Sequence, residues 1–485
     1  MKTREEIYAI YDLGREAVAD LVQDLYRLIE QQQAQIASLM ARVKELENQL
    51  ATDSHNSSKP PSSDGFGKKT QSLRQPSGKK SGGQTGHKGT TLKQVAEPDR
   101  IVTHAPEQCE GCQADLKEVP GMLSEDRRQV FELPPLKLEV TQHQLITKAC
   151  PVCGRQNTGR FPDDILPGAQ YGSSVKSLAV YLNTQQLLPW RRTCQLLEEL
   201  GGQPVAQGTL YGAVQECAAE LAGIELVIKE TIASAEVVHF DETGMYVSGK
   251  REWLHVASTP RLTAYAHDPK RGATATKAIG ILPGFKGRAI HDGFGSYWTY
   301  KCEHGLCNAH HLRELTFIHE RLGQEWARKM KDLLVEIKSE VDTAKLRGDT
   351  TLGELPQEAY SKRYQAILAE GVALEQTTPP LQTGKRGRKK QSKSKNLLDR
   401  MAKYQAETLA FMRDFNVSFD NNLAERDIRM MKVQQKISGG FRTTQGAKTF
   451  CRIRSYISTM SKQGHNILTA LKSVFAGNPI SPSPG

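Results

Sequence analysis

Two pairs of cysteines constrain this chain more than any other feature of its sequence. Cys109 and Cys112 form the first pair, Cys150 and Cys153 form the second, and 37 residues separate the pairs. A Cys-x2-Cys turn aims two thiolates at one cation, and four thiolates close the tetrahedral shell of a structural zinc ion. The chain has nine cysteines in 485 residues and no signal-peptide core, which favours metal ligation over disulfides. We therefore predict a zinc ribbon with strands between the pairs; chance pairing is the alternative.

A seven-residue repeat precedes the ribbon, between residues 20 and 50. β-Branched residues at its first position and Leu at its second favour a parallel two-stranded coiled coil. The alternative is one amphipathic helix packed on its own protein. The first position holds Val22, Ile29, Ile36, Val43 and Leu50, and the second holds Leu25, Gln32, Leu39 and Leu46.

The net charge of +11 is concentrated in two segments. Residues 54–90 carry seven Lys or Arg and one acid, and residues 385–395 carry seven and none, so the rest of the chain sums to −2. Ser, Gly and Pro supply 18 of the 37 residues in the first segment, which predicts a disordered basic linker. This distribution favours a polyanionic partner such as nucleic acid; the alternative is a pair of linkers made basic for solubility.

Helical patterns occupy residues 174–230. We expect one helix from Leu187 to Leu200, a stop at Gly201 and Gly202, and a second helix from Gly208 with Thr209 as its N-cap. Two short helices around a Gly-containing turn are typical of a helix-turn-helix DNA reader, and equally of a plain packing unit.

Strand patterns begin at residue 236, and two of the predicted strands end on an acid before a turn. These acids are Asp241 and Asp292, and a third, Glu425, lies at a predicted helix start. Carboxylates on neighbouring strands can share hard cations such as Mg²⁺ or Mn²⁺. Singly, each Asp also fits a turn-starting residue, and Glu425 fits a capping box with Asn422.

The motifs together resemble the insertion-sequence 66 family of bacterial DDE (Asp-Asp-Glu) transposases, over nearly the whole chain. They are Asn56-Ser-Ser-Lys-Pro-Pro-Ser-Ser-Asp, Gly82-Gly-Gln-Thr-Gly-His-Lys-Gly, the cysteine pairs, His239-Phe-Asp-Glu-Thr-Gly, Asp292-Gly-Phe-Gly-Ser-Tyr, Cys307-Asn-Ala-His-His-Leu-Arg-Glu-Leu and Asp420-Asn-Asn-Leu-Ala-Glu-Arg-Asp-Ile-Arg. The resemblance implies an α/β RNase H-like catalytic domain with the triad Asp241, Asp292 and Glu425, and an all-α insertion from about residue 320 to 412.

The same resemblance implies that Cys307 and His310 shape the catalytic core as a Cys-x2-His element. Their spacing with Cys302 and His304 leaves a second zinc site as the alternative. In the implied chemistry, two Mg²⁺ or Mn²⁺ ions per site support DNA cleavage and strand transfer as in-line displacements at phosphorus. We expect Asp241 to bridge the two ions.

The expected partners are double-stranded DNA (the terminal inverted repeats and the target), a second copy or more of the chain, and small accessory proteins of the same element. The rival functions are a nuclease without joining activity and an inactive DNA-binding regulator. We expect a cytoplasmic location, associated with the nucleoid when bound to DNA. The candidate DNA-binding residues are Arg191, Arg192, Lys385, Arg386, Arg388, Lys389, Lys390, Arg426, Arg429 and Lys432, with Arg442, Lys448, Arg452 and Arg454 near the C-terminus.

The expected organisation is multidomain. It comprises a coiled-coil helix (1–52), the basic linker (53–94), the zinc ribbon (95–168), a helical DNA-binding domain (169–232), the first part of the catalytic core (233–320), the helical insertion with its basic loop (321–412), the second part of the core with C-terminal helices (413–475) and a tail (476–485).

Overall fold

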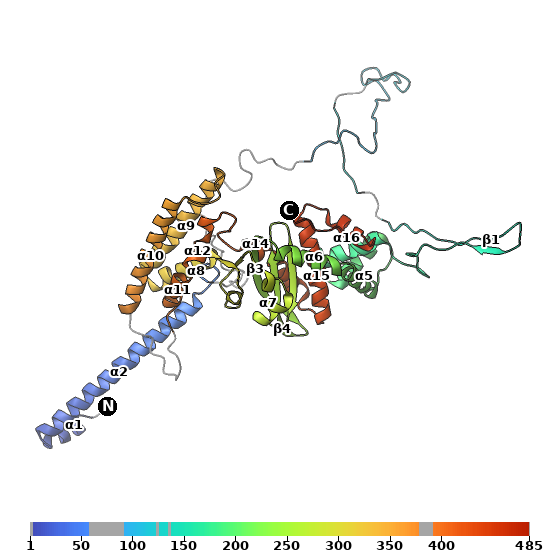
Figure 1. Ribbon diagram of the computed structural model, residues 1–485. Helices are drawn as coiled ribbons and strands as arrows, with labels where there is room; N and C mark the ends of the chain where they lie inside the picture. The colour runs from blue at the N-terminus through green and yellow to red at the C-terminus, as the bar shows by residue number, and fades with distance from the viewer. Residues whose placement is uncertain (1–2, 58–91, 123–125, 134–136, 378–390, 485) are drawn as a thin grey trace. The chain divides into compact units, whose positions relative to one another are not determined.

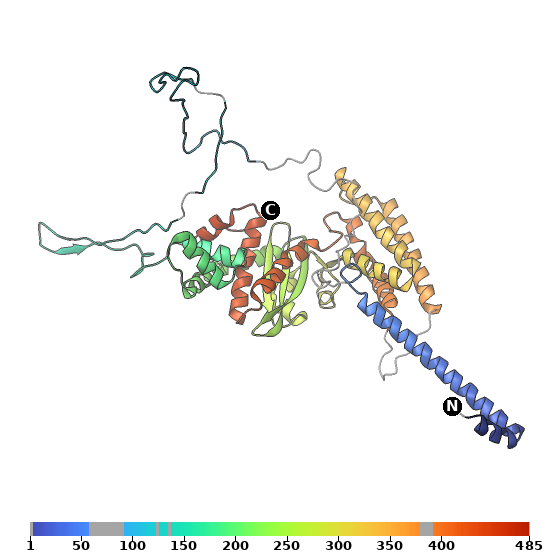
Figure 2. The ribbon, with the colours of Figure 1, turned by 180° about the vertical axis from the view of Figure 1, so that it is seen from behind.

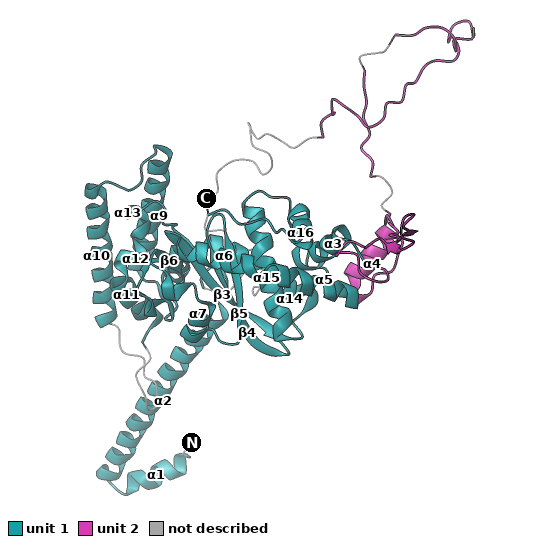
Figure 3. Ribbon diagram, turned by 45° about the vertical axis from the view of Figure 1, so that its right-hand side comes forward, with its two compact units in different colours: residues 1–73, 171–190, 208–485 teal, residues 74–170, 191–207 magenta. Residues whose placement is uncertain are grey.

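The structure is a computed structural model that describes residues 3–57, 92–122, 126–133, 137–377 and 391–484. It divides into two compact units (Figure 3). The first contains residues 1–73, 171–190 and 208–485, and the second contains residues 74–170 and 191–207. No helix among the described residues is long and apolar enough to cross a membrane.

Two helices form the N-terminus. Thr3 and Glu6 make reciprocal side-chain to backbone hydrogen bonds, a capping box that starts α1 (Arg4–Asp12). α2 (Arg15–Leu50) is a single helix of 36 residues, so the long helix predicted from the repeat is confirmed. Its apolar side chains are exposed, including Val22, Ile36 and Leu39 of the repeat.

A five-stranded sheet lies at the centre of the first unit (Figure 1). Its strands are β3 (Val237–Val247), β4 (Lys250–Ser258), β5 (Thr263–Asp268), β6 (Arg288–His291) and β7 (Glu303–Leu306). The order across the sheet is β5-β4-β3-β6-β7. The first three strands form an antiparallel meander, whereas β6 and β7 continue from β3 in parallel. The crossover from β5 to β6 contains α7 (Ala273–Ile279) and the 3-10 turn Leu282–Gly284.

Asp241 does not end its strand, which corrects the sequence prediction. The predicted turn, Glu242 to Gly244, instead pairs with β4, with Gly244 opposite Trp253. A side chain on Gly244 would come within 2.9 Å of Arg251, so this glycine serves close packing and not chain reversal. The hairpin turns at Ser248 and Gly249, which both have positive φ, as a tight two-residue turn requires.

Helices cover both faces of this sheet. α14 (Asn422–Ser438) and α15 (Thr444–Lys462) pack on one face, where Met245 and Tyr265 join a core with Ile428 and Phe450 (Figure 2). Residues of α7 lie on the other face, beside side chains at alternate strand positions such as Phe240. Residues at odd and even positions of β3 therefore face different layers.

A helical bundle is inserted between β7 and α14. It comprises α8 (Asn308–Leu322), α9 (Glu325–Leu346), α10 (Glu354–Thr377), α11 (Lys393–Lys403), α12 (Gln405–Thr408) and α13 (Ala410–Arg413). These helices share one core, in which Trp326, Tyr364 and Met401 are fully or almost fully buried. The N–H of Asn308 donates to the carbonyl of Phe419 at 3.0 Å, so the bundle leaves and rejoins the sheet at one place.

The remaining helices lie around residues 173–233 and at the C-terminus. They are α3 (Ser173–Val180) with a π-helical turn (Tyr181–Gln185), α4 (Trp190–Gly201), α5 (Gln207–Glu220), α6 (Ala222–Ala233) and α16 (Ile467–Phe475). α5 begins at Gln207, so the N-cap predicted at Thr209 is wrong and Thr209 lies in the first turn. Most of α4 belongs to the second unit and α5 to the first, so their arrangement as a helix-turn-helix stays a prediction.

The second unit contains one short hairpin, formed by β1 (Thr147–Ala149) and β2 (Gln156–Thr158) around Cys150 and Cys153. Most of the strands predicted between the cysteine pairs are absent, because the described residues 126–133 and 137–146 contain none. Their apolar side chains, such as Val130 and Val140, are exposed. Alternating apolar and polar residues form a strand only where the apolar face of that strand can be buried, and the apolar face is not buried here.

Candidate active site

The register of the central sheet brings two of the three predicted acids together. β3 pairs with β6 in parallel, with His239 opposite Ile290. Two residues further along, Asp241 in β3 stands opposite Asp292, which directly follows β6. Each carboxylate is anchored on one side by a backbone N–H: Glu242 donates to Asp241 Oδ1 and Phe294 donates to Asp292 Oδ1, both at 2.8 Å. The other oxygen of each Asp takes no part in these two hydrogen bonds.

Glu425 comes from the first turn of α14, whose start is fixed by Asn421. The Asn421 side chain does not cap the helix. Its Nδ2 donates to the carbonyl of Phe240 at 2.8 Å, and its Oδ1 accepts a hydrogen bond from His239 Nδ1 at 2.9 Å. The helix start is thus tied to β3 at the residue before Asp241. Because α14 has no side-chain cap at its start, the capping-box alternative for Glu425 is wrong.

Asp241 lies among like charges. Burial raises its pKa well above the usual aspartate value, and the carboxylates of Glu242, Asp292 and Glu425 raise it further. Asp292 and Glu425 are thus near enough to influence Asp241, but the ligand atoms of the three acids do not all lie within 4.8 Å of one another. An arrangement of this kind is unfavourable unless a cation or protons neutralise it. The donor set contains only oxygens, which suits a hard divalent cation such as Mg²⁺.

Glu242 and Arg271 complete the surroundings of Asp292 and were missed by the sequence reasoning. Burial raises the pKa of Glu242, whose side chain is only 2% exposed. Its oxygens accept hydrogen bonds from Tyr297 at 2.5 Å and Arg271 at 2.7 Å. The Arg271 guanidinium also lies 3.9 Å from Asp292 Oδ2 and 3.9 Å from the ring centre of Phe294. In the sequence, the acid directly after Asp241 was the one feature that could have indicated a role for Glu242 in the site.

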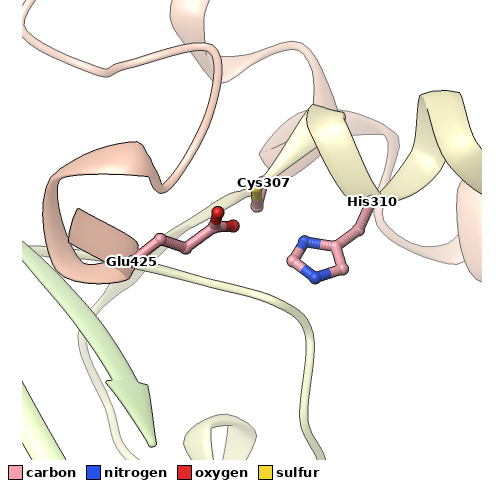
Figure 4. A group of neighbouring side chains, drawn as sticks. All are labelled: Cys307, His310 and Glu425. Carbon is pink, nitrogen blue, oxygen red and sulfur yellow. The ribbon is translucent and has the colours of Figure 1, made fainter. Parts of the chain in front are cut away.

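The Cys-x2-His element lies against the third acid. The ligand atoms of Cys307, His310 and Glu425 all lie within 4.8 Å of one another (Figure 4). Cys307 is 1% exposed, and burial together with the charge of Glu425 raises the pKa of its thiol to about 12. Its sulfur accepts the N–H of Asn421 at 3.2 Å.

Cys302 and His304 do not join this group. Among the described residues, no other set of three Cys, His, Asp or Glu ligand atoms is gathered so closely. His304 Nδ1 lies 3.0 Å from His291 Nε2, and its ring packs on Trp298 with centroids 4.6 Å apart. The four-residue zinc site considered as an alternative is therefore not formed, because Cys302 and His304 lie before and within β7, whereas Cys307 and His310 follow that strand.

The two cysteine pairs form matching knuckles. In the first, Cys109 N donates to Ala114 O, and Gln113 N donates to Cys109 O, each at 2.9 Å. In the second, Cys150 N donates to Arg155 O at 2.8 Å and Gly154 N donates to Cys150 O at 2.9 Å. Backbone N–H groups within each turn lower the pKa of Cys109 and of Cys150, which favours the thiolates that zinc requires. The structure does not bring the two pairs together around a common point.

The predicted DNA-binding residues fall into three groups. Arg191, Arg192, Arg426 and Arg429 are exposed, and the last two lie on the same helix as Glu425. Lys432 is half-buried and donates to the carbonyl of Gly244 at 3.2 Å. The basic-loop residues Lys385, Arg386, Arg388, Lys389 and Lys390 lie outside the described residues.

Two of the C-terminal arginines are engaged within the protein. Arg452 pairs with Glu225 at 2.5 Å, and the half-buried Arg454 bonds to Gln185. Burial lowers the pKa of Arg454, and its contact with DNA stays a prediction.

Comparison with known families gives three matches. Residues 168–449, more than half of the chain, match the family described as "Transposase IS66 family". Residues 106–154, which contain all four knuckle cysteines, match the "zinc-finger binding domain of transposase IS66". Residues 10–93 match a family of unknown function. No curated protein matches the chain.

Proposed function

Because the chain belongs to the IS66 family of transposases, we propose that it cleaves DNA at the ends of an insertion sequence and joins those ends to target DNA. In this proposal Asp241, Asp292 and Glu425 are the catalytic carboxylates. The observation that carries the proposal is that β3, which holds Asp241, pairs in parallel with β6, which leads to Asp292, while Asn421 ties the start of α14, which holds Glu425, to β3. The strand order β5-β4-β3-β6-β7, with a meander extended in parallel, supports an RNase H-like fold.

The three carboxylates fit a pair of Mg²⁺ or Mn²⁺ ions. Their donor atoms are all oxygens, and the crowding of buried negative charge around Asp241 calls for cations. When bound, two such ions supply activation of the attacking oxygen and stabilisation of the leaving oxygen at phosphorus. Asp241 interacts with both other acids, so we assign it the position shared between the ions.

The protein's own residues hold these ligands in place. Backbone N–H groups of Glu242 and Phe294 fix one oxygen of each Asp and leave the other free to ligate. Arg271 neutralises Glu242 and lies beside Asp292 at the half-exposed edge of the site. A guanidinium in this position is suited to binding a phosphate oxygen of DNA.

DNA binding is assigned to the zinc finger and to exposed arginines. Arg426 and Arg429 are exposed on α14, the helix that carries Glu425, so they can contact the backbone of DNA that enters the active site. Arg191 and Arg192 begin α4, an exposed position suited to end recognition. Zinc held by Cys109, Cys112, Cys150 and Cys153 would fold the finger and leave no open position for chemistry.

Self-association is assigned to α2. The apolar residues at the two positions of its repeat are 42% to 83% exposed, among them Leu46 and Leu50, and form a stripe along the helix that only Gln32 interrupts. Apolar residues that recur every 3.5 positions on average pack against the same residues of a second, parallel helix. Pairing would place two active sites in one assembly, one for each end of the element.

The test is a cleavage assay with labelled DNA that carries a terminal repeat of the element. We expect wild-type protein to cut in Mg²⁺ and Glu425→Gln to lose at least a hundredfold in rate while still binding the DNA. Glu230→Gln, at an exposed glutamate on α6, is the matched control and should cut like wild type. Equal cutting by the Glu425→Gln protein would refute the assignment of the triad. A second assay, with DNA whose ends are already cut, then tests strand joining separately from cleavage.

A further inference from the structure

The turn from β7 into α8 presents a thiol and an imidazole to the active-site glutamate. Cys307 is the N-cap residue of α8, and His310 lies three residues later, on the same side of the helix. Figure 4 shows Cys307 and His310 beside the carboxylate of Glu425, which comes from α14. Sulfur, nitrogen and oxygen donors thus meet from two elements that are 115 residues apart, as counted from His310 to Glu425.

Two buried atoms of this group are unsatisfied. In the described part of the chain, Glu425 Oε1 and His310 Nδ1 have no hydrogen-bond partner, although neither is accessible to solvent. Buried polar atoms are normally paired, and an exception calls for an explanation such as a bound ion. The two atoms do not satisfy each other, even though they belong to side chains whose ligand atoms lie within 4.8 Å.

The donor set is wrong for magnesium and right for zinc. Thiolate and imidazole are the ligands that zinc and similar ions prefer, whereas Mg²⁺ binds oxygens. Ligand atoms of a tetrahedral zinc site lie about 3.3–3.8 Å apart, as follows from bond lengths of ~2.0–2.3 Å. A small movement of three side chains from their present spacing meets that requirement.

We propose that Cys307, His310 and Glu425 bind one zinc-class ion, distinct from the ions of the catalytic triad. Water would complete the tetrahedron. Cys307 is already held by the N–H of Asn421 at 3.2 Å and, through its own N–H, by the carbonyl of His291 at 3.0 Å. The thiol is therefore positioned before an ion arrives.

The consequence for the active site rests on the proposed function, but the binding of the ion does not. A carboxylate has two oxygens, so Glu425 can hold the zinc-class ion with one and serve the site of Asp241 and Asp292 with the other. An ion at this position would fix Glu425, a side chain that has no hydrogen bond to its Oε1 in the described structure. It would link the turn at Cys307 to the triad.

The test counts zinc in the full-length protein. The protein is equilibrated with Zn²⁺ alone, freed of unbound metal by gel filtration, and measured for zinc per chain. We expect wild type to hold one ion more than Cys307→Ser and one more than His310→Gln. Cys302→Ser, a half-buried cysteine at the far end of β7, is the matched control and should equal wild type.

Two further variants decide which site the ion occupies. Asp241→Asn should retain the extra ion, because Asp241 is not a ligand; loss of the ion in that variant would overturn the proposal. Equal zinc in wild type and in folded Cys307→Ser and His310→Gln proteins, judged by near-UV circular dichroism, would also overturn it. The count needs no DNA, so failure of the cleavage assay would affect the proposed function and leave this result intact.

Discussion

Replacing Asn421 tests how the active site is assembled. The Asn421 side chain is 1% exposed and makes two hydrogen bonds, to Phe240 O and from His239 Nδ1. Asn421→Ala removes both and leaves their buried partners unpaired, at about 1–3 kcal/mol for each group. We therefore expect a loss of about 2–6 kcal/mol in the free energy of unfolding. Because Glu425 would shift relative to Asp241, we also expect cleavage to slow about a hundredfold.

The assay is urea denaturation followed by tryptophan fluorescence. All four tryptophans, at 190, 253, 298 and 326, belong to the first unit, so the signal reports on the domain that contains Asn421. Asn422→Ala is the matched control, since Asn422 is exposed and should change stability by less than about 0.5 kcal/mol. If the two variants unfold at the same urea concentration, the tether between α14 and β3 does not hold the site together.

Two other predictions concern charge and assembly. Folding raises the pKa of Asp241, so the folded protein holds the proton of this carboxyl group more tightly than the unfolded chain does. The free energy of unfolding therefore falls as the pH rises from about 3.9, the pKa in the unfolded chain, through the higher pKa of the folded protein. Without divalent metal, the Asp241→Asn protein should therefore melt at a higher temperature than wild type near neutral pH, and the two melting temperatures should become equal in acid. Its cleavage of DNA in Mg²⁺ should be lost. A melting temperature below that of wild type near neutral pH would contradict the crowding of charge around Asp241. For α2, Leu39→Glu should convert a dimer to a monomer in size-exclusion chromatography with light scattering, whereas Ala41→Glu, on the opposite side of the heptad, should not. An unchanged mass for Leu39→Glu would exclude the stripe as the interface.

Periodic features of the fold were predictable from the sequence. The repeat that contains Ile36 and Leu39 predicted a long helix, and α2 is that helix. The strand patterns predicted from residue 236 onward include β3, β4 and β5, and Asp292 follows β6 as expected. Each of these predictions depends on a burial pattern that repeats over many residues, so a single misleading residue does not change it.

Features that depend on tertiary contacts were not predictable. Glu-Thr-Gly after Asp241 has the composition of a turn, yet it continues β3 because β4 pairs with it and Arg251 packs over Gly244. The approach of Cys307 to Glu425 depends on the turn from β7 into α8 and on the packing of α14 against β3, which no local pattern encodes. The same holds for Arg271, whose role beside Asp292 follows from its place after β5 and not from a motif.

The attachment of the helical bundle has an evolutionary consequence. Its entry and exit are joined by the hydrogen bond from Asn308 N to Phe419 O, and Asn308 Nδ2 also reaches the carbonyl of Thr408 at 2.9 Å. A module whose two ends meet can lengthen, shrink or be exchanged without altering the path of the strands before it or the helix after it. Bundles of different size can therefore be carried on one sheet without moving Asp241, Asp292 or Glu425.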